Sequence, residues 1–215
     1  MAESAVAELE EAIYSGRLPP GAPLRLEELA RELDMSISPV REAVRRLEAL
    51  GLAVHVPHRG AWVSELAIED LHDTYEVRLT LETLAVRRAA PRFTNADTEA
   101  ARAALAEYAA AHRRQDAGAA RRAHADFHFA LYAAAGSDWL VRVIRPVWQN
   151  AERYRAASLP RRGSLRQREN EHERILDACA RHDPETAAAE LHRHLAVTAN
   201  LVARQMGTSD LFPER

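Results

Sequence analysis

The sequence has little of what secreted and membrane-bound proteins need. Its single cysteine, Cys179, excludes an intramolecular disulfide bond, as expected for a protein of the reducing cytoplasm. No apolar run is long enough to cross a lipid bilayer, and the acidic N-terminus does not resemble a secretory signal. We therefore expect a cytoplasmic protein without a membrane partner.

Lysine is absent as well. All 29 basic side chains are arginine, and the 32 acidic side chains leave a formal net charge of −3. Such a balance does not by itself indicate a nucleic-acid partner. If the protein binds DNA, its positive charge must be gathered in one place.

The apolar spacing of the first third predicts a small mixed domain. It favours helices over 2–15, 26–33 and 36–50, and then two short strands over 52–56 and 61–64. Two tightly joined helices, the second beginning with Ser-x-Ser-Pro, are typical of a helix-turn-helix, and the strands would form its wing.

The remainder has no strand pattern and predicts helices joined by short connections, which favour antiparallel neighbours. The predicted helices lie near 67–89, 95–112, 117–135, 138–157, 164–181 and 184–206. The predicted fold is thus mainly α, with an N-terminal winged helix-turn-helix followed by an antiparallel all-α ligand-binding bundle. The expected domains are 1–65 and 66–207, with a flexible tail over 208–215.

The third helix carries the groups that a DNA-reading helix needs. Ser36 and Ser38 supply hydroxyls at its start, where Ser36 is expected to cap the helix, and Arg41 and Arg45 share one face. A guanidinium group matches both phosphate oxygens and the O6/N7 edge of guanine. Arg59 and Gly60 stand at the wing tip. The alternative interpretation of the third helix is a solvated face whose arginines pair with glutamates. The expected DNA-binding residues are Ser36, Ser38, Arg41, Arg45, Arg59 and Gly60.

Four histidines in the helical part could meet at one point. His124 and His128 are four residues apart and share a helix face, where two imidazoles can grip one metal ion. His172 and His194 stand at equal sequence distances from Asp183, which begins a hairpin corner, so both lie about 16 Å along their helices. These spacings predict a metal site of His124, His128, His172 and His194. The alternative is four ordinary hydrogen-bonded histidines.

Arg78 is expected to point into the bundle, because it shares a helix face with Leu71 and Tyr75. A buried guanidinium group needs an anion. The sequence leaves two candidates open, Glu82 one turn further along and the carboxylate of a bound effector.

Both parts of the chain resemble known families. The first resembles the winged helix-turn-helix of GntR-family bacterial regulators in Pro20-Gly21, Leu29-Ala30, Ser38-Pro39-Val40-Arg41-Glu42-Ala43, Leu47, Gly51-Leu52 and Arg59-Gly60. The second resembles the FCD ligand-binding domain of the FadR subfamily, in its six-helix VanR-like variant. Its signatures are Glu76-x-Arg78-x-x-x-Glu82, Phe127-His128, Ala134-Ala135-Gly136-Ser137, Glu171-His172, Ile175-Leu176-Asp177-Ala178 and His194-Leu195.

The resemblance implies a divalent metal held by one aspartate and three histidines beside the effector. The histidines correspond to His128, His172 and His194, and His124 stands in place of the aspartate. An all-histidine site would suit zinc or nickel better than magnesium. The chain also departs from many relatives at Ile37, where they carry arginine, so the usual operator contact is not expected there.

Together these features predict a bacterial DNA-binding transcription regulator. We expect it to act as a repressor and to bind a palindromic operator as a homodimer. A small carboxylate bound by the metal and Arg78 would control its affinity for the operator. The alternative is a metal-dependent enzyme that uses the histidine site, but no general base is placed as in His-Glu-x-x-His. A third possibility is a bundle with purely structural histidines that regulates through dimerisation.

Overall fold

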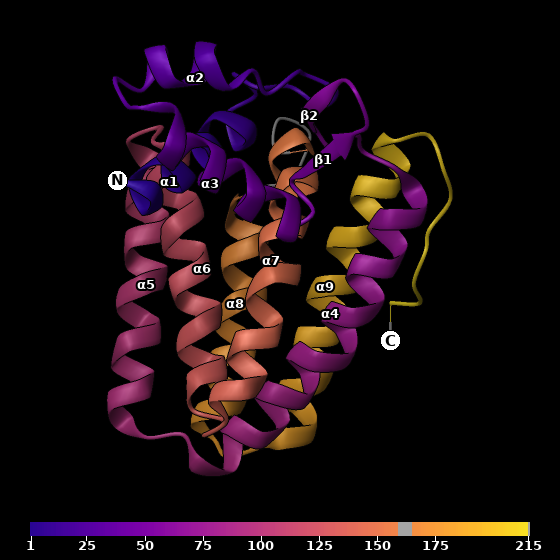
Figure 1. The fold of residues 1–215 in the computed structure, drawn as a ribbon. Coiled ribbons are helices and arrows are strands. Elements are labelled where there is room, and N and C mark those ends of the chain that lie inside the picture. Colours follow the sequence, from indigo (N-terminus) through magenta and orange to yellow (C-terminus); the bar gives the residue numbers. More distant parts are fainter. Residues whose placement is uncertain (159–164, 215) are drawn as a thin grey trace.

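The computed structural model describes residues 1–158 and 165–214, which form a small domain seated on one end of a long helical domain (Figure 1). The small domain consists of α1 (Ala2–Tyr14), α2 (Leu26–Glu32), α3 (Ile37–Ala49), β1 (Ala53–Val56) and β2 (Gly60–Val63). The strands pair antiparallel, with Ala53 opposite Val63 and Val56 opposite Gly60. The expected winged helix-turn-helix fold is confirmed.

The spacing of its hydrophobic residues explains which face of α3 packs against the core of the small domain. Val40, Val44 and Leu47 lie on one face, and all three are buried in the core of the small domain. Ser36 occupies the N-cap position, but its side chain makes no capping hydrogen bond, contrary to our expectation. The reason is local: the third residue of the helix is Pro39, which has no N–H for the hydroxyl group to accept from.

The helical domain is the predicted antiparallel bundle. Its elements are α4 (Ile68–Ala89), the 3-10 turn η1 (Ala90–Arg92), α5 (Asn95–Arg113), α6 (Ala117–Ala133), α7 (Asp138–Ser158), α8 (Leu165–Ala180) and α9 (Pro184–Gln205). Figure 1 shows α5 and α6 on one side, α4 and α9 on the other, and α7 and α8 between them. Within the described ranges, no helix is both long and apolar enough to span a membrane.

The chain after α9 folds back onto the bundle. The Asn200 side chain donates to the carbonyl oxygen of Phe212 at 2.8 Å and accepts from the backbone N–H groups of Leu211 and Phe212. The Phe212 ring stacks on His72 of α4 with 5.1 Å between ring centroids. The buried Asn200 thus supplies hydrogen-bond partners for the backbone of residues 211 and 212, and this part of the chain packs against the bundle. The flexibility of the tail over 208–215 stays a prediction.

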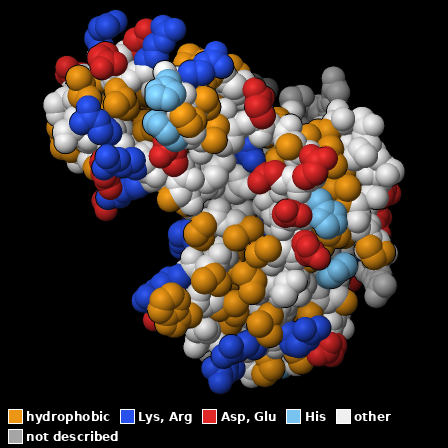
Figure 2. Space-filling view, turned by 45° about the vertical axis from the view of Figure 1, so that its right-hand side comes forward, with side chains coloured by type: hydrophobic (Ala, Val, Ile, Leu, Met, Phe, Trp, Pro, Cys, Tyr) orange, Lys and Arg blue, Asp and Glu red, His pale blue; other side chains and the backbone are white. Residues whose placement is uncertain are grey.

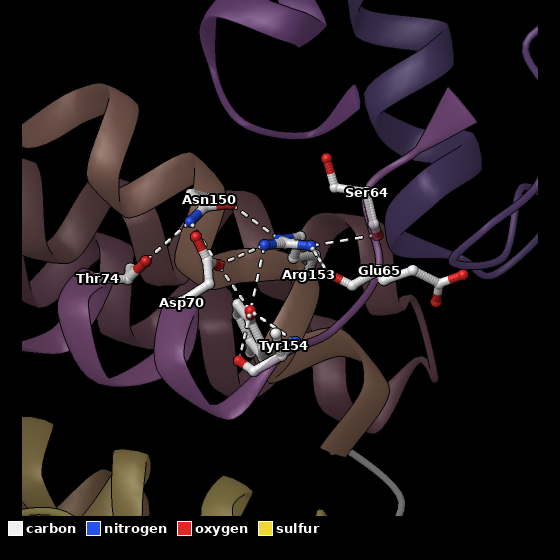
Figure 3. A network of polar contacts seen from close by, with 8 residues as sticks. Ser64, Glu65, Asp70, Thr74, Asn150, Arg153 and Tyr154 are labelled. Atoms are coloured by element: carbon white, nitrogen blue, oxygen red, sulfur yellow. Dashed lines mark hydrogen bonds and ion pairs between the residues drawn. The ribbon is translucent and has the colours of Figure 1, made fainter. Parts of the chain in front are cut away.

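A cluster of polar side chains holds the connection between the domains (Figure 3). Arg153 of α7 donates to the carbonyl oxygens of Ser64 and Glu65 at 3.2 and 2.7 Å, and it forms an ion pair with Asp70. The Tyr154 hydroxyl donates to the same carboxylate at 2.6 Å. The linker therefore lies against α7 and is bound to it, so a displacement of α7 would be felt directly by the small domain.

Candidate functional site

A groove of about 760 Å³ runs between α2, α3 and the β-hairpin. Of the predicted DNA-binding residues, Arg41, Arg45, Arg59 and Gly60 line it, and all four are exposed. Ser36 and Ser38 are exposed at the start of α3. Arginines from separate elements converge on this surface, so its local charge is positive although the net charge of the whole chain is negative.

The groove also contains arginines that the sequence analysis missed. Arg25 and Arg31 line its α2 side. The sequence could have indicated these two residues, because they stand at the ends of α2, the helix that precedes the reading helix. Arg25 is paired with Glu28 at 3.0 Å across an exposed surface, so this ion pair leaves the guanidinium group accessible to a phosphate.

The wing tip has a defined shape. Gly60 has φ +81°, a backbone conformation that other residues adopt only at a cost, and a Cβ there would meet nothing within 4 Å. The Trp62 indole N–H donates to the Arg59 carbonyl oxygen at 3.2 Å, and the Arg59 guanidinium carbon lies 5.4 Å from the Trp62 ring centroid. The tip thus presents a positioned arginine beside backbone that a partner could approach closely.

The four predicted histidines converge in the helical domain. His124 and His128 come from α6, His172 from α8 and His194 from α9, and all four are buried. One ligand atom from each lies within 4.8 Å of those of the others. Four neutral imidazole donors at such separations fit a late transition-metal ion such as zinc or nickel, whereas a magnesium ion prefers oxygen ligands.

Two of these histidines have partners that aim the other ring nitrogen at the cluster. His194 Nδ1 lies 2.9 Å from a carboxylate oxygen of Glu171, and His128 Nδ1 lies 3.1 Å from the Tyr132 hydroxyl. Each Nδ1–H can donate to its partner, which leaves the Nε2 lone pair facing the cluster. Such outer contacts fix the tautomer and orientation of metal-binding histidines in general.

His124 is held differently. Its Nδ1 accepts from the Arg155 guanidinium group at 2.8 Å, since arginine can only donate. A neutral His124 ring therefore carries its proton on Nε2, which faces His128 Nε2 at 3.2 Å. This ring would have to give up the Nε2 proton to bind a metal ion through that atom.

The electrostatic surroundings favour neutral rings. Burial lowers the pKa of His124 well below its usual value, and the Arg155 charge lowers it further. Burial also lowers the pKa of His128, and the neighbouring histidines act in the same direction. Neutral imidazole is the form that binds a metal ion, so burial favours metal binding by His128, whereas His124 must also lose its Nε2 proton.

The structure supplies one of the two partners left open for Arg78. Arg78 binds Glu82 with two hydrogen bonds of 2.6 and 3.2 Å, and the two side chains are 2% and 0% exposed. Burial alone would lower the pKa of Arg78, but the Glu82 charge and hydrogen bonds, together with Tyr75 and Tyr132, outweigh burial and raise the pKa. Tyr132 donates to the same carboxylate at 2.5 Å, so Arg78 is linked to His128 through Glu82 and Tyr132.

Comparisons with known proteins cover both domains. The model described as "Bacterial regulatory proteins, gntR family" matches residues 1–63, and the FCD domain model matches residues 73–197. The "Probable D-xylose utilization operon transcriptional repressor" of Paenarthrobacter nicotinovorans is 33% identical over 202 residues, which are 92% of this chain and 87% of that protein. The Nta operon transcriptional regulator of Aminobacter aminovorans is 30% identical, with 82% of each chain covered.

The fold has a close solved counterpart. The structure of McbR/YncC from E. coli superposes with a TM-score of 0.83 at 24% identity, and it covers 95% of this chain and 98% of that one. At this level of identity, the likeness concerns the fold alone.

Proposed function

The chain belongs to the gntR family of bacterial regulatory proteins and carries an FCD domain behind its reading domain, and from this premise we propose that it is a repressor controlled by a small organic acid. It is a transcription regulator, since its relatives are transcriptional regulators and not enzymes. The name of the xylose-operon relative, a repressor, supports the direction of regulation that we propose. A regulator of this kind acts in the bacterial cytoplasm, where Cys179 stays reduced.

One observation carries the proposal: α7 contacts both the histidine cluster and the linker to the reading domain. Arg155 of α7 binds His124, and Arg153, two residues earlier, binds the linker carbonyl groups (Figure 3). A ligand that shifts α7 would therefore move the reading domain. It can change operator affinity only as far as it prefers one arrangement, typically by about 1–3 kcal/mol.

We assign the metal ion to His124, His128, His172 and His194. A bound zinc or nickel ion would offer a Lewis-acidic position for one carboxylate group of the effector. Glu171 and Tyr132 would orient His194 and His128 toward it. Direct contact of Arg78 with the effector stays a prediction, and it requires the displacement of Glu82. In the present geometry Arg78 acts as a positioning residue that holds Glu82, Tyr132 and His128 in line.

The DNA-binding role is tested by Arg41→Ala. We expect this exposed groove residue to contribute about 1–3 kcal/mol to specific binding, because a guanidinium group matches a guanine edge. The measurement is the affinity for a palindromic operator at fixed salt concentration, with unfolding followed to show that the domain is intact. Arg102→Ala, an exposed arginine on α5, is the control and should bind like wild type. Wild-type operator affinity in Arg41→Ala would contradict the assignment.

We propose that the protein is a homodimer, since one reading helix covers only half of a palindromic site. An apolar face of the helical domain supports this: Val77 and Leu84 of α4 and Trp139 and Val143 of α7 are 40–72% exposed. Figure 2 shows hydrophobic side chains gathered on the front of this domain. A contiguous exposed apolar patch usually marks an interface.

Placing charge on this face tests the dimer. Trp139→Asp/Val143→Asp should shift the protein from dimer to monomer in sedimentation analysis, because burying two carboxylates in an apolar interface is costly. Val54→Asp is the matched control, since Val54 is 48% exposed on the wing, away from the helical domain. A double variant that dimerises as tightly as wild type would place the interface elsewhere.

A further inference from the structure

A cavity of about 420 Å³ lies where α5, α6, α7 and α8 come together, next to the small domain. Its volume falls in the range of sites for small organic ligands. It adjoins the histidine cluster, because Tyr108 lines the cavity and its ring centroid is 5.6 Å from that of His124. Arg155 also lines the cavity, and its guanidinium group donates to His124.

The wall of this cavity carries more positive than negative charge. Arg121, Arg155 and Arg168 line it, against the carboxylates of Asp116 and Glu152. Both carboxylates already serve other groups: Asp116 accepts from the Ala119 N–H at 2.8 Å as the cap of α6, and Glu152 pairs with Arg155. Arg121 is paired with Glu11, so an anion in the cavity would have to take the place of this carboxylate to bind Arg121.

His112, which also lines the cavity, holds a polar atom that lacks a partner in the part of the chain that the structure describes. His112 Nε2 is buried, and among the described residues it has no hydrogen-bond partner. Burial and the nearby Arg168 charge lower the pKa of His112, so its ring is neutral at physiological pH. A neutral imidazole can donate to or accept from a ligand, and buried polar atoms are rarely left unsatisfied.

Arg121 belongs both to this cavity and to the contact between the domains. Its guanidinium group forms an ion pair with Glu11 of α1, and its central carbon lies 5.0 Å from the ring centroid of Tyr14. The neighbouring Glu10 accepts from the Gln149 side chain at 2.9 Å. Glu11 thus helps to hold α1 on the helical domain, and its partner Arg121 lines the cavity.

We propose that this cavity binds a small dicarboxylate and that Arg121 couples the binding to the reading domain. The ligand replaces Glu11 as the partner of Arg121, which removes one of the polar contacts that hold α1 on the helical domain. The inference rests on the proposed function, since it names the effector class and the residue that passes on its signal. It places the anion contacts at Arg121, Arg155 and Arg168, away from the buried Arg78.

Substitution on both sides of the ion pair tests the coupling with sodium succinate as the probe, measured by calorimetry on the full chain. Arg121→Gln should weaken succinate binding by about tenfold or more, because a charge-assisted contact is lost. Glu11→Gln should instead tighten it by about two- to fivefold, because a competitor of modest strength is removed. Arg122→Gln and Glu8→Gln, exposed neighbours on the same helices, should bind succinate like wild type.

Operator binding gives the second readout. Succinate should change the operator affinity of wild type but have little effect on Glu11→Gln, in which the ion pair is already absent. Unchanged succinate affinity in Glu11→Gln would overturn the coupling, and phosphate or sulfate binding without dicarboxylate binding would overturn the ligand class. If neither succinate nor its longer and hydroxylated homologues bind wild type at millimolar concentration, the cavity is not an effector site. Failure of the proposed function would look different, because wild type would then bind no operator even without ligand.

Discussion

Replacing Glu82 with glutamine should lower the free energy of unfolding by about 3–5 kcal/mol, although the side chain keeps its shape. The Arg78 and Glu82 side chains are 2% and 0% exposed, so the substitution leaves a buried guanidinium group without its counter-charge. Arginine does not lose its proton in proteins, so this charge cannot be relieved by titration. The measurement is urea denaturation of the full chain.

The chain offers a matched control. Arg46 and Glu42 form an ion pair at the same helical spacing, but their side chains are 47% and 48% exposed. Glu42→Gln should therefore cost no more than about 0.5 kcal/mol, because water and salt screen such a pair. Equal losses in the two variants would show that burial of the Arg78–Glu82 pair has no energetic consequence.

A double substitution separates stability from function. Arg78→Met/Glu82→Leu should recover most of the lost stability, because a buried ion pair can be replaced by apolar groups of similar volume. It should still weaken metal binding by about 10–100-fold, because the Tyr132 hydroxyl loses its acceptor and no longer fixes the His128 ring. This result would mean that the Arg78–Glu82 ion pair contributes more to the orientation of the histidine cluster than to the stability of the fold.

The elements that sequence could predict are those specified by local pattern. The helix boundaries follow from apolar spacing and from breakers such as Asp183, which caps α9 by accepting from the Thr186 N–H. The convergence of the four histidines was accessible because His172 and His194 flank one tight corner, and helical rise then fixes their depth. In these cases, residues close in sequence determine the geometry.

The missed features depend on how distant helices pack. The contact of Arg155 with His124 joins residues 31 apart, and that of Arg121 with Glu11 joins residues 110 apart. No periodicity links such positions, and arginine on a helix usually indicates a solvated face. The cavity between α5 and α8 has the same origin, since a cavity is formed by what neighbouring helices fail to fill. Sequence analysis could therefore bring the four histidines together but not place the charges around them.

Loading the protein with zinc or nickel should stabilise it by about 4 kcal/mol at a free metal concentration roughly a thousandfold above the dissociation constant. The ion would bind the folded histidine cluster and not the unfolded chain, in which these residues are scattered. His128→Ala/His172→Ala should show no metal-dependent shift in melting temperature and should lose the bound ion in elemental analysis. His55→Ala, an exposed histidine on the wing, should retain both.

The same cluster sets the pH dependence of stability, and its sign follows from the shifted pKa values. Burial lowers the pKa of His124 and His128 well below 6.5, the usual value for histidine. Below about pH 6.5 the unfolded chain therefore binds more protons than the folded one, and stability falls as pH falls. Metal binding requires the same neutral rings, and burial keeps them neutral in the folded protein, so the stabilisation by metal should shrink only below about pH 6.5, as these rings take up protons. A metal-dependent shift that persists in the double variant would mean that the ion binds elsewhere.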